Sequence, residues 1–375
     1  MKILILNWRD IRNSSSGGAE ILTQEIAKYW IKKGCEVTQF SSRFPNSLPE
    51  EIVDGVRIIR AGYPDLRKLF KSVHVLAFWY YQRKFKGKFD IVIDEFHGVP
   101  FFTPWYVKEK KIVLICEVAG GLWINIFGFF FGTIGKIIEK LCLKSIYKNI
   151  HFIAISDSVK QDLIQNGVRK ENISVIKMGI RIPAISRKLN KEKDPTLIFL
   201  GRISISKGIE DVLIAFKEVN ATYSYAKLWL VGRGEESYVK YVTDLAKKLD
   251  IEDKVVFWGF ISEEKKYNLL SRAWILIHPS KNEGWGINVI EANAVGTPCV
   301  GYNISGLKDS IQNGKTGLLT EHNTPHFLAK AVIRLIKDKE LYRSISSNSI
   351  KWSKNFFWEE AGKKSLSIIK KIYEQ

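Results

Sequence analysis

The sequence predicts an α/β protein of two domains, each built on a parallel sheet with helices on both faces. Short apolar runs typical of buried strands alternate with amphipathic helical segments from the first residues onward. A length of 375 residues provides enough chain for two or three domains with sizeable cores. The polar segment 184–195 separates two such series and is typical of a linker. Because ligands of open parallel sheets bind at the carboxyl ends of the strands, the loops there are predicted to carry the chemistry.

The first series begins with a βαβ unit. A strand over 3–6, a flexible loop over 13–18, a helix over 19–33 that Gly34 ends and a strand over 37–40 are predicted in turn. Further strands are expected at 91–93, 112–115 and 152–155, and Ser156 is a good N-cap for a helix through Gln165. The second series has predicted strands at 196–200, 228–231, 255–258 and 275–277, with a helix over 209–219. We therefore expect an N-terminal domain of residues 1–185 and a C-terminal domain of residues 186–356.

The composition predicts a globular protein with an anionic partner. Hydrophobic residues make up 46% of the chain and charged residues 26%, which argues against disorder. The net charge of +19 is uneven, because residues 1–190 hold 30 Lys and Arg against 17 Asp and Glu, and the remainder holds 28 against 22. Four widely spaced cysteines support neither a disulfide framework nor a zinc site, and the apolar start is too short for a secretory signal. We therefore expect a reduced, cytoplasmic setting.

The segment between Leu66 and Phe89 contains no acidic residue. Its cations are Arg67, Lys68, Lys71, Arg83, Lys84, Lys86 and Lys88, interleaved with aromatic residues. Helical spacing predicts a buried stripe of Leu66, Leu69, Val73, Leu76 and Tyr80, with Phe78 among the cations on the opposite side. Nucleic acid and an anionic membrane surface would both suit this face, and a solvated basic helix is the alternative interpretation.

A second unusual stretch is LWINIFGFFFGTI, residues 122–134, which Lys136, Lys140 and Lys144 follow. Its apolar run is shorter than the roughly 20 residues that a membrane-spanning helix needs. Two interpretations stay open at this point. The segment is either part of a buried core or a hydrophobic lip that enters the bilayer interface.

Two loops of the second series have the residue types that bind a nucleotide. Gly201 to Gly208 follows a predicted strand and contains Arg202 and Lys207, so glycines, a helix N-terminus and two cations suit a diphosphate, although solvated loop cations are the alternative. In the segment 277–300, Glu283 and Glu291 are eight residues apart on either side of a helix start. A carboxylate can accept hydrogen bonds from a vicinal diol or from sugar hydroxyls. The two carboxylates are therefore predicted to contact one ligand.

The chain resembles the retaining glycosyltransferases of family 4, the group 1 glycosyltransferases with a GT-B fold. The matching segments are Gly17-Gly18-Ala19-Glu20, FLGRISISKGIEDVLIAF, LWLVGRGEE, VVFWGF, HPSKNEGWGINVIEANAVGTPCV and GLKDSIQNGKTGLL, and they extend over nearly the whole chain. The resemblance implies two Rossmann-like doubly wound domains that face a central cleft. It also implies that the N-terminal domain binds the acceptor, that the C-terminal domain binds the nucleotide sugar, and that a final helix, about 357–375, crosses back onto the N-terminal domain.

The resemblance assigns roles by matching position. Arg202 and Lys207 would bind the donor diphosphate and stabilise the leaving group, and Glu283 would contact the transferred sugar. Glu291 would hold the ribose diol, and the backbone amides of Gly286, Ile287 and Asn288 would face phosphate or sugar hydroxyls.

Other positions complete the implied donor site. Gly259, Phe260 and Ile261 would lie beside the nucleobase, and Arg233, in the Gly232–Gly234 loop, would contact the donor nucleotide. Gly17 and Gly18 would let the N-terminal loop approach the diphosphate and the acceptor.

One position departs from the family pattern. Many members carry a histidine after the strand that matches 112–115, whereas this chain has Cys116 and Glu117 there. His97, which follows the preceding strand, is a candidate substitute, and an ordinary loop histidine is the alternative. We place His97, Cys116 and Glu117 on the acceptor side.

The resemblance implies transfer of a hexose from a UDP- or GDP-linked sugar with retention at the anomeric carbon, by front-face substitution. The chain has no DXD-type motif, so neither a metal nor another cofactor is expected. A sugar-nucleotide epimerase and a glucan synthase on the same fold are the alternative enzymes. A basic nucleic-acid-binding protein is the alternative from another class, but no helix-turn-helix, zinc or RNP-type motif supports it, so no nucleic acid partner is expected.

The expected partners are therefore a nucleotide-sugar donor and a glycan or lipid-linked acceptor. An anionic membrane surface is expected to bind through residues 67–88, and also through 122–144 if that segment is a lip. These partners predict a peripheral position on the inner face of the cell membrane.

Overall fold

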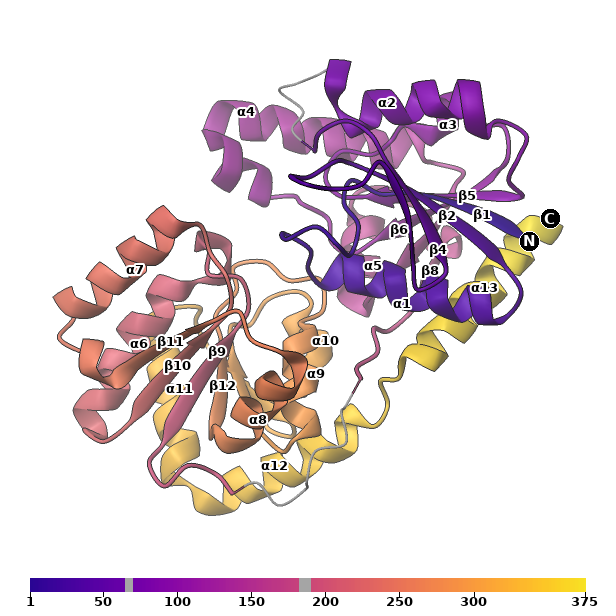
Figure 1. The fold of residues 1–375 in the computed structure, drawn as a ribbon. Helices are drawn as coiled ribbons and strands as arrows, with labels where there is room; N and C mark the ends of the chain where they lie inside the picture. The colour runs from indigo at the N-terminus through magenta and orange to yellow at the C-terminus, as the bar shows by residue number, and fades with distance from the viewer. Residues whose placement is uncertain (65–69, 182–189) are drawn as a thin grey trace. The chain divides into compact units, whose positions relative to one another are not determined.

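The structure, a computed structural model, describes residues 1–64, 70–181 and 190–375, and the side chains of residues 125 and 126 are not described. The chain divides into two compact units (Figure 1). The N-terminal unit comprises Met1–Gly179 and Phe357–Gln375, and the C-terminal unit comprises Ile180–Phe356. The predicted boundary at 185 falls among residues that are not described.

The N-terminal unit contains an eight-stranded sheet. Its strands are β1 (Lys2–Leu6), β2 (Glu36–Ser41), β3 (Glu50–Val53), β4 (Val56–Arg60), β5 (Ile91–Phe96), β6 (Lys110–Ile115), β7 (His151–Ala154) and β8 (Ile173–Val175). Its helical elements are α1 (Gly18–Lys32), α2 (Val73–Tyr80), η2 (Tyr81–Phe85), α3 (Thr103–Tyr106), α4 (Leu122–Leu141), η3 (Cys142–Ile146), α5 (Asp157–Gln165), η4 (Lys170–Asn172) and α13 (Trp358–Glu374).

The C-terminal unit contains a six-stranded sheet. Its strands are β9 (Thr196–Leu200), β10 (Lys227–Val231), β11 (Val255–Gly259), β12 (Ile275–His278), β13 (Cys299–Gly301) and β14 (Gly317–Leu319). Its helical elements are η5 (Ile205–Lys207), α6 (Ile209–Thr222), α7 (Glu236–Lys248), η6 (Glu252–Lys254), α8 (Glu263–Arg272), α9 (Ile287–Ala294), α10 (Leu307–Ser310), α11 (Pro325–Lys337) and α12 (Lys339–Ser353).

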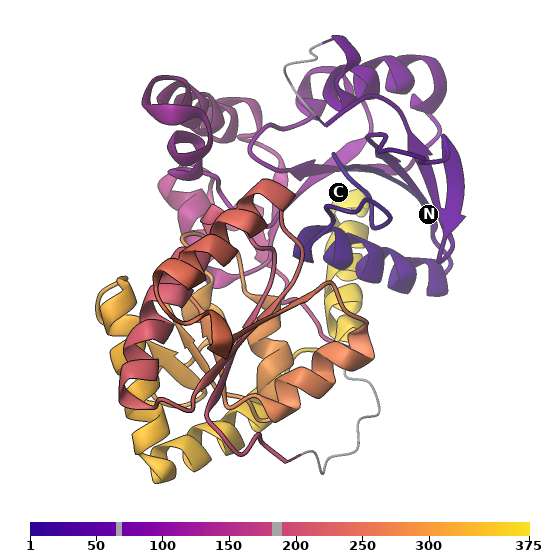
Figure 2. The same cartoon turned by 60° about the vertical axis from the view of Figure 1, so that its left-hand side comes forward.

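Both sheets are doubly wound. The strand order is β3-β4-β2-β1-β5-β6-β7-β8 in the N-terminal unit, where only the β3–β4 pair is antiparallel, and β11-β10-β9-β12-β13-β14 in the C-terminal unit, where every pair is parallel. Helices cover both faces of each sheet (Figures 1 and 2). The parallel α/β architecture predicted from the alternating pattern is therefore confirmed.

The strand β9 shows why the predicted strands are continuously apolar. Leu197 and Phe199 face one core of the C-terminal unit, whereas Ile198 and Leu200 face a second core on the other side of the sheet. All four side chains are buried, because side chains alternate between the faces of a strand and helices cover both faces here.

The final helix α13 belongs to the N-terminal unit and packs against α1. The Trp30 indole Nε1 donates a hydrogen bond of 3.0 Å to the Ser365 hydroxyl in this contact. A β-carbon on Gly362 would lie only 2.4 Å from the Tyr29 side chain, so the absence of a side chain at Gly362 lets the two helices approach.

The described part of the predicted linker, residues 190–195, has no regular structure but is packed on the C-terminal unit. The Lys191 Nζ donates to the Ala273 carbonyl at 2.7 Å and to the Thr297 hydroxyl at 2.6 Å. Glu192 forms an ion pair with Arg272. These contacts attach this part of the predicted linker to the C-terminal unit.

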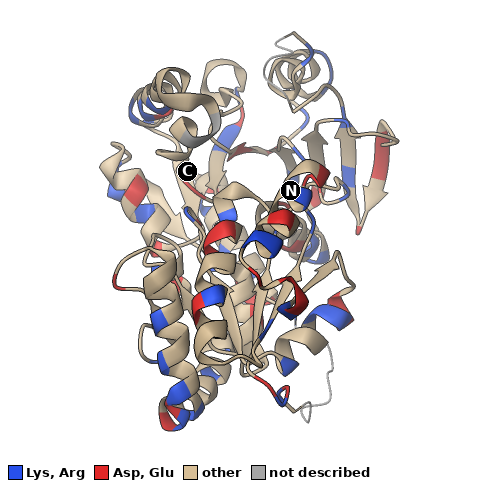
Figure 3. Cartoon of the chain, turned by 90° about the vertical axis from the view of Figure 1, so that its left-hand side faces the viewer, with Lys and Arg blue, Asp and Glu red and all other residues tan. Residues whose placement is uncertain are grey.

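The predicted helix over 66–80 begins later than its apolar stripe suggested. The Ser72 hydroxyl accepts a hydrogen bond from the Val75 amide and caps α2, which starts at Val73. Val73 is buried, but Leu76 and Tyr80 are only half-buried. Leu66, Leu69, Arg67 and Lys68 lie outside the described residues, whereas Lys71, Arg83, Lys84, Lys86 and Lys88 are exposed. Lys and Arg also occur among acidic residues on helices of both units (Figure 3).

Helix α4 is a hairpin of two helical segments that meet at Gly128, whose φ of 76° and ψ of 175° are not helical. A β-carbon on Gly132 would lie 2.4 Å from the Ile124 backbone, and one on Gly135 would lie 2.5 Å from the Trp123 ring. The buried Glu139 carboxylate accepts from the Ala119 and Gly120 amides and from the Trp123 indole. We call residues 122–141 the α4 hairpin (Figure 1).

Large apolar side chains lie exposed on the α4 hairpin. Their exposed fractions range from 41% to 80%, and the residues are Phe127, Phe129, Phe130, Phe131, Ile134, Ile137, Ile138 and Leu141. The buried-core interpretation of residues 122–134 is therefore wrong for these side chains. No helix among the described residues is long and apolar enough to cross a membrane.

Candidate functional site

The predicted diphosphate loop follows β9 in the C-terminal unit. Gly208 has a φ of 67° and precedes α6, and a β-carbon there would lie 2.2 Å from the Pro279 carbonyl oxygen. Gly208 therefore brings the Lys207 loop into contact with the loop that contains Glu283. Arg202 lies on the same loop and is exposed.

Lys207 and Glu283 form the centre of the site. The Lys207 Nζ lies 2.6 Å from Glu283 Oε2, and both side chains are largely buried. Burial would raise the pKa of Glu283, but the Lys207 ammonium and His278 outweigh it and lower the pKa below its usual range. Glu283 is therefore a carboxylate at neutral pH, and its polar contacts with described residues all involve Oε2. Its Oε1 is left to accept from a ligand hydroxyl.

His278, which the sequence analysis did not select, orients Glu283. The Asn288 side-chain amide donates to the Leu200 carbonyl at 2.5 Å and to His278 Nδ1 at 3.1 Å. Because Nδ1 accepts, Nε2 carries the proton and donates to Glu283 Oε2 at 3.2 Å. The side chain of Asn288, predicted here only for its backbone amide, thus sets the tautomer of His278.

The start of α9 lies beside the Lys207–Glu283 ion pair. Gly286 is the N-cap residue, with a φ of 83°, and Ile287 begins the helix. The first amides of a helix have no partner within it and form a ready anion site. The Glu283–Gly284 backbone is held close, because a β-carbon on Gly306 would lie 2.1 Å from the Glu283 carbonyl oxygen. Gly306, which the sequence did not predict as part of the site, therefore lets the loop that contains Glu283 pack closely over α10.

Glu291 lies one turn farther along α9 and forms an ion pair that the sequence did not predict. The Lys266 Nζ of α8 lies 2.7 Å from Glu291 Oε1, and both side chains are almost buried. The two glutamates therefore each have one ammonium partner, Lys207 for Glu283 and Lys266 for Glu291.

The predicted nucleobase loop follows β11. The Arg233 guanidinium lies 3.8 Å from the centre of the Phe260 ring, which is 68% exposed. A cation over an aromatic face is a favourable contact and forms a flat surface on which a base can stack. Gly259 joins this loop to the preceding one, because the Gly232 amide donates to the Gly259 carbonyl at 2.9 Å. Ile261 is half-buried and packs against the core.

The N-terminal unit contains the remaining predicted residues. Gly17 is the N-cap of α1, and its amide donates to Glu20 Oε2 at 2.6 Å, with Gly18 the first residue of the helix. The Glu95 carboxylate accepts from Thr23 and Asn7 and lies 3.2 Å from His97 Nε2.

This buried contact shifts the pKa of His97. Burial lowers the pKa of His97, but Glu95 outweighs that effect and raises it, while burial raises the pKa of Glu95. Burial and nearby carboxylates raise the pKa of the Cys116 thiol well above its usual range, so it is neutral at pH 7. Glu117 is half-buried. Whether His97 replaces the family histidine stays a prediction.

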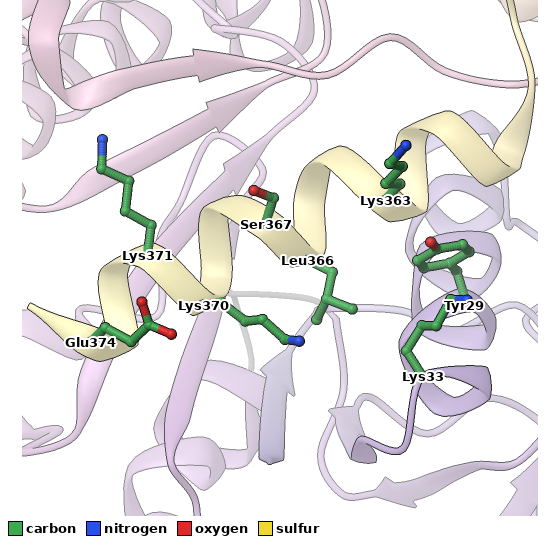
Figure 4. A pocket seen from close by; sticks show the side chains of 8 residues that line it. All are labelled: Tyr29, Lys33, Lys363, Leu366, Ser367, Lys370, Lys371 and Glu374. Carbon is green, nitrogen blue, oxygen red and sulfur yellow. The ribbon is translucent and has the colours of Figure 1, made fainter.

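A surface groove of about 510 Å³ lies between α1 and α13. Figure 4 shows Tyr29 of α1 and Lys33, which follows the last residue of α1, opposite Leu366 and Lys370 of α13. None of the predicted site residues lines it. Among the described residues, no group of three or more His, Cys, Asp or Glu side chains could hold a metal ion.

Comparison with known proteins identifies the class. The family model described as glycosyl transferases group 1 matches residues 181–352, and the model described as glycosyltransferase family 4 matches residues 16–182. The chain belongs to the group 1 glycosyltransferases.

Individual relatives agree with this assignment. An uncharacterized glycosyltransferase of Methanocaldococcus jannaschii is 24% identical over 394 residues, which cover 99% of this chain and 98% of the relative. The structure of sucrose-phosphate synthase from Thermosynechococcus elongatus is similar with a TM-score of 0.82, at 20% identity over 100% of this chain and 99% of that one. The structure of Anabaena HepE in complex with UDP-glucose gives a TM-score of 0.74, at 18% identity over 99% of this chain and 100% of that one. The fold of this chain is GT-B.

Proposed function

We propose that this protein is a retaining hexosyltransferase of family 4 that uses a UDP- or GDP-linked sugar and needs no metal. The observation that supports the proposal most directly is the convergence of Lys207, Glu283 and the first turn of α9 at the carboxyl edge of one sheet. A cation and helix amides suit a diphosphate, and a held carboxylate beside them suits a sugar hydroxyl. The complex of Anabaena HepE with UDP-glucose supports a nucleotide-sugar donor.

The proposed reaction is a front-face substitution. The bond between the anomeric carbon and the diphosphate breaks, the acceptor oxygen bonds to that carbon from the same face, and the acceptor proton goes to a donor phosphate oxygen. Lys207 and Arg202 offset the charge that develops on the diphosphate, which is where electrostatic stabilisation contributes most. A double displacement of the kind that retaining glycosidases use needs two carboxyl groups that flank the anomeric carbon, and the family resemblance assigns only Glu283 to the transferred sugar.

We also propose that the acceptor is a glycan or a lipid-linked oligosaccharide and that the N-terminal unit rests on the inner face of the cell membrane. The α4 hairpin supports this position with its exposed apolar side chains and with Lys136 and Lys140, both exposed, close to them. An apolar surface beside cations suits the boundary between acyl chains and anionic headgroups. The exposed cations among residues 70–88 of the basic segment add charge of the same sign.

The donor test combines binding and turnover. We expect one of a panel of UDP- and GDP-hexoses to bind and to be hydrolysed slowly without acceptor, at a rate that EDTA does not change. With acceptor, NMR should show the donor's anomeric configuration in the product. Complete loss of activity in EDTA that Mg²⁺ or Mn²⁺ restores would contradict metal independence, and an epimerised nucleotide sugar as the only product would contradict transfer.

Substitution of Phe129, Phe130 and Phe131 by Ser together should weaken binding to vesicles of phosphatidylglycerol and phosphatidylcholine on the order of 100-fold. Each partly inserted ring contributes about 1 kcal/mol of apolar burial. Sedimentation with vesicles measures the partition. The matched control is Ile52→Ser, because Ile52 is 73% exposed on β3 of the same unit. Equal partition of the triple variant and the wild type would remove the α4 hairpin from the membrane contact.

A further inference from the structure

Lys266 is not among the residues that the family resemblance assigns, yet its ammonium occupies the ribose end of the proposed donor site. Its Nζ contacts Glu291 Oε1 at 2.7 Å and Glu263 Oε1 at 2.8 Å. Only 13% of the Lys266 side chain and 12% of the Glu291 side chain are exposed, whereas Glu263 is 74% exposed. The inner contact, with Glu291, is therefore the one that solvent screens least.

Helix α8 holds the ammonium in place. The Ser262 hydroxyl accepts from the Lys265 amide and caps α8 one residue before Glu263. Glu263 and Lys266 are three residues apart on this helix, and their ion pair fixes the lysine chain from the solvent side. Lys266 thus reaches Glu291 from a rigid element rather than from a loop.

The charge of Glu291 depends on this contact. Burial raises the pKa of Glu291, and the nearby Glu263 charge raises it further, while the Lys266 ammonium opposes both. The Tyr267 hydroxyl also faces this group, and burial together with the two glutamates raises its pKa, so it remains neutral. The pKa of Glu291 stays above its usual value even with Lys266 in place, so losing the ammonium would raise this pKa further.

The geometry of the pair leaves room for a diol. In the described part of the chain, every hydrogen bond and ion pair to the Glu291 carboxylate ends on Oε1. A carboxylate offers about four lone-pair positions. Oε2 and the remaining position on Oε1 can therefore accept from two vicinal hydroxyls while Lys266 stays bound.

We propose that Lys266 is a positioning residue of the ribose site, which holds the Glu291 carboxylate in the orientation that accepts both hydroxyls of the donor ribose. This inference rests on the proposed function, because it requires a nucleoside diphosphate in this site. It assigns to Lys266 a role in donor binding that requires no contact between Lys266 and the transferred sugar.

The test measures how much the diol contributes to affinity. Titration calorimetry would give the dissociation constants of UDP and GDP and of their 2′,3′-dideoxy analogues, for the full-length wild type, Lys266→Met and Lys266→Arg at pH 6 and pH 8. For the nucleotide that the wild type binds, we expect the diol to improve affinity by about 10-fold or more at both pH values.

The advantage of the diol is the ratio of the dissociation constant of the dideoxy analogue to that of the nucleotide. In Lys266→Met, this ratio should fall toward 1 at pH 6 and recover partly at pH 8. The sign follows because a carboxyl that has lost its cation takes up a proton at higher pH, and a protonated carboxyl accepts fewer hydrogen bonds. Lys266→Arg keeps the charge and should keep most of the advantage. Glu263→Gln is the matched control, since it removes the exposed partner of Lys266 and leaves the contact with Glu291.

Each of four results would overturn the inference. Equal weakening of the nucleotide and its dideoxy analogue in Lys266→Met would show a merely structural role. Tighter binding of the nucleotide would show that Lys266 competes with ribose. If the wild type binds neither UDP nor GDP, the proposed function fails and the inference with it, whereas a wild type that binds while Lys266→Met keeps the full diol advantage refutes this inference alone.

Discussion

Lys207→Met should lower the rate constant of sugar transfer by about 10²- to 10³-fold at saturating donor, the usual cost of removing one group that stabilises developing charge. The variant loses the ammonium that we assign to the departing diphosphate. It also leaves His278 as the remaining polar contact of the Glu283 carboxylate among the described residues, and because burial raises the pKa of that carboxyl, the loss of Lys207 moves the pKa of Glu283 upward. Initial rates with labelled donor, measured from pH 5 to pH 8, check both effects.

The matched control for Lys207→Met is Lys281→Met. Lys281 is exposed on the neighbouring loop, and its backbone amide donates to the Ser206 carbonyl at 2.9 Å. We expect this variant to transfer sugar at nearly the wild-type rate. A rate for Lys207→Met within threefold of the wild type would remove Lys207 from the catalytic group. Thermal unfolding of both variants would show whether a lost rate reflects a lost fold.

The fold could be predicted because its signal is repeated along the chain. Each central strand is buried on both faces, so runs such as 197–200 are apolar, and each is followed by a helix with one apolar face. Because many residues contribute to each strand–helix pattern, one misread position changes the prediction little. The short strands β13 and β14 span three residues each and carry no such pattern.

Site residues could be predicted where a motif within one loop contains the functional side chain. They were missed where their role depends on contacts between residues far apart in the sequence. Lys207 and Glu283 were selected from their own loops, and the structure brings them to 2.6 Å. His278 is the last residue of an otherwise apolar strand, and Lys266 is one of two adjacent lysines on a polar helix. The sequence around each residue therefore does not mark it as part of a site. Only the packing of α8 against α9 makes Lys266 different from Lys265. Sequence spacing within a single helix does not contain that information.

The sequence of the α4 hairpin contains glycines whose spacing indicates its close packing. Gly128, Gly132 and Gly135 lie at a chain reversal and at two positions where the backbone or the Trp123 ring passes too close for a side chain. Glycines at such spacing in an apolar run indicate close packing of the run against itself. That packing leaves the phenylalanines on the outside, so a buried core could have been judged less favourable from the sequence.

Arg60→Met should lower the free energy of unfolding of the N-terminal unit by about 3–5 kcal/mol, because it leaves the buried Asp10 carboxylate without its partner. The Arg60 side chain is fully buried, and its Nε and Nη2 donate to the two Asp10 oxygens at 2.6 and 2.8 Å. The same Asp10 accepts from the Arg12 amide at the start of the loop that leads to Gly17. The ion pair therefore ties the predicted acceptor-side loop to β4.

Urea unfolding of the full chain, followed by tryptophan fluorescence, tests this expectation. Only the transition of the N-terminal unit should move in Arg60→Met, so the transition of the C-terminal unit serves as the internal reference. The double variant Asp10→Leu with Arg60→Met should recover much of the loss, because removing both buried charges also removes their desolvation cost. A double variant less stable than Arg60→Met would show that the Asp10 contacts to the loop, rather than the unpaired charge, account for the effect. The loop that leads to Gly17 would then depend on Asp10 itself, so its conformation would be lost in the double variant and kept in Arg60→Met, where the Arg12 amide still donates to Asp10.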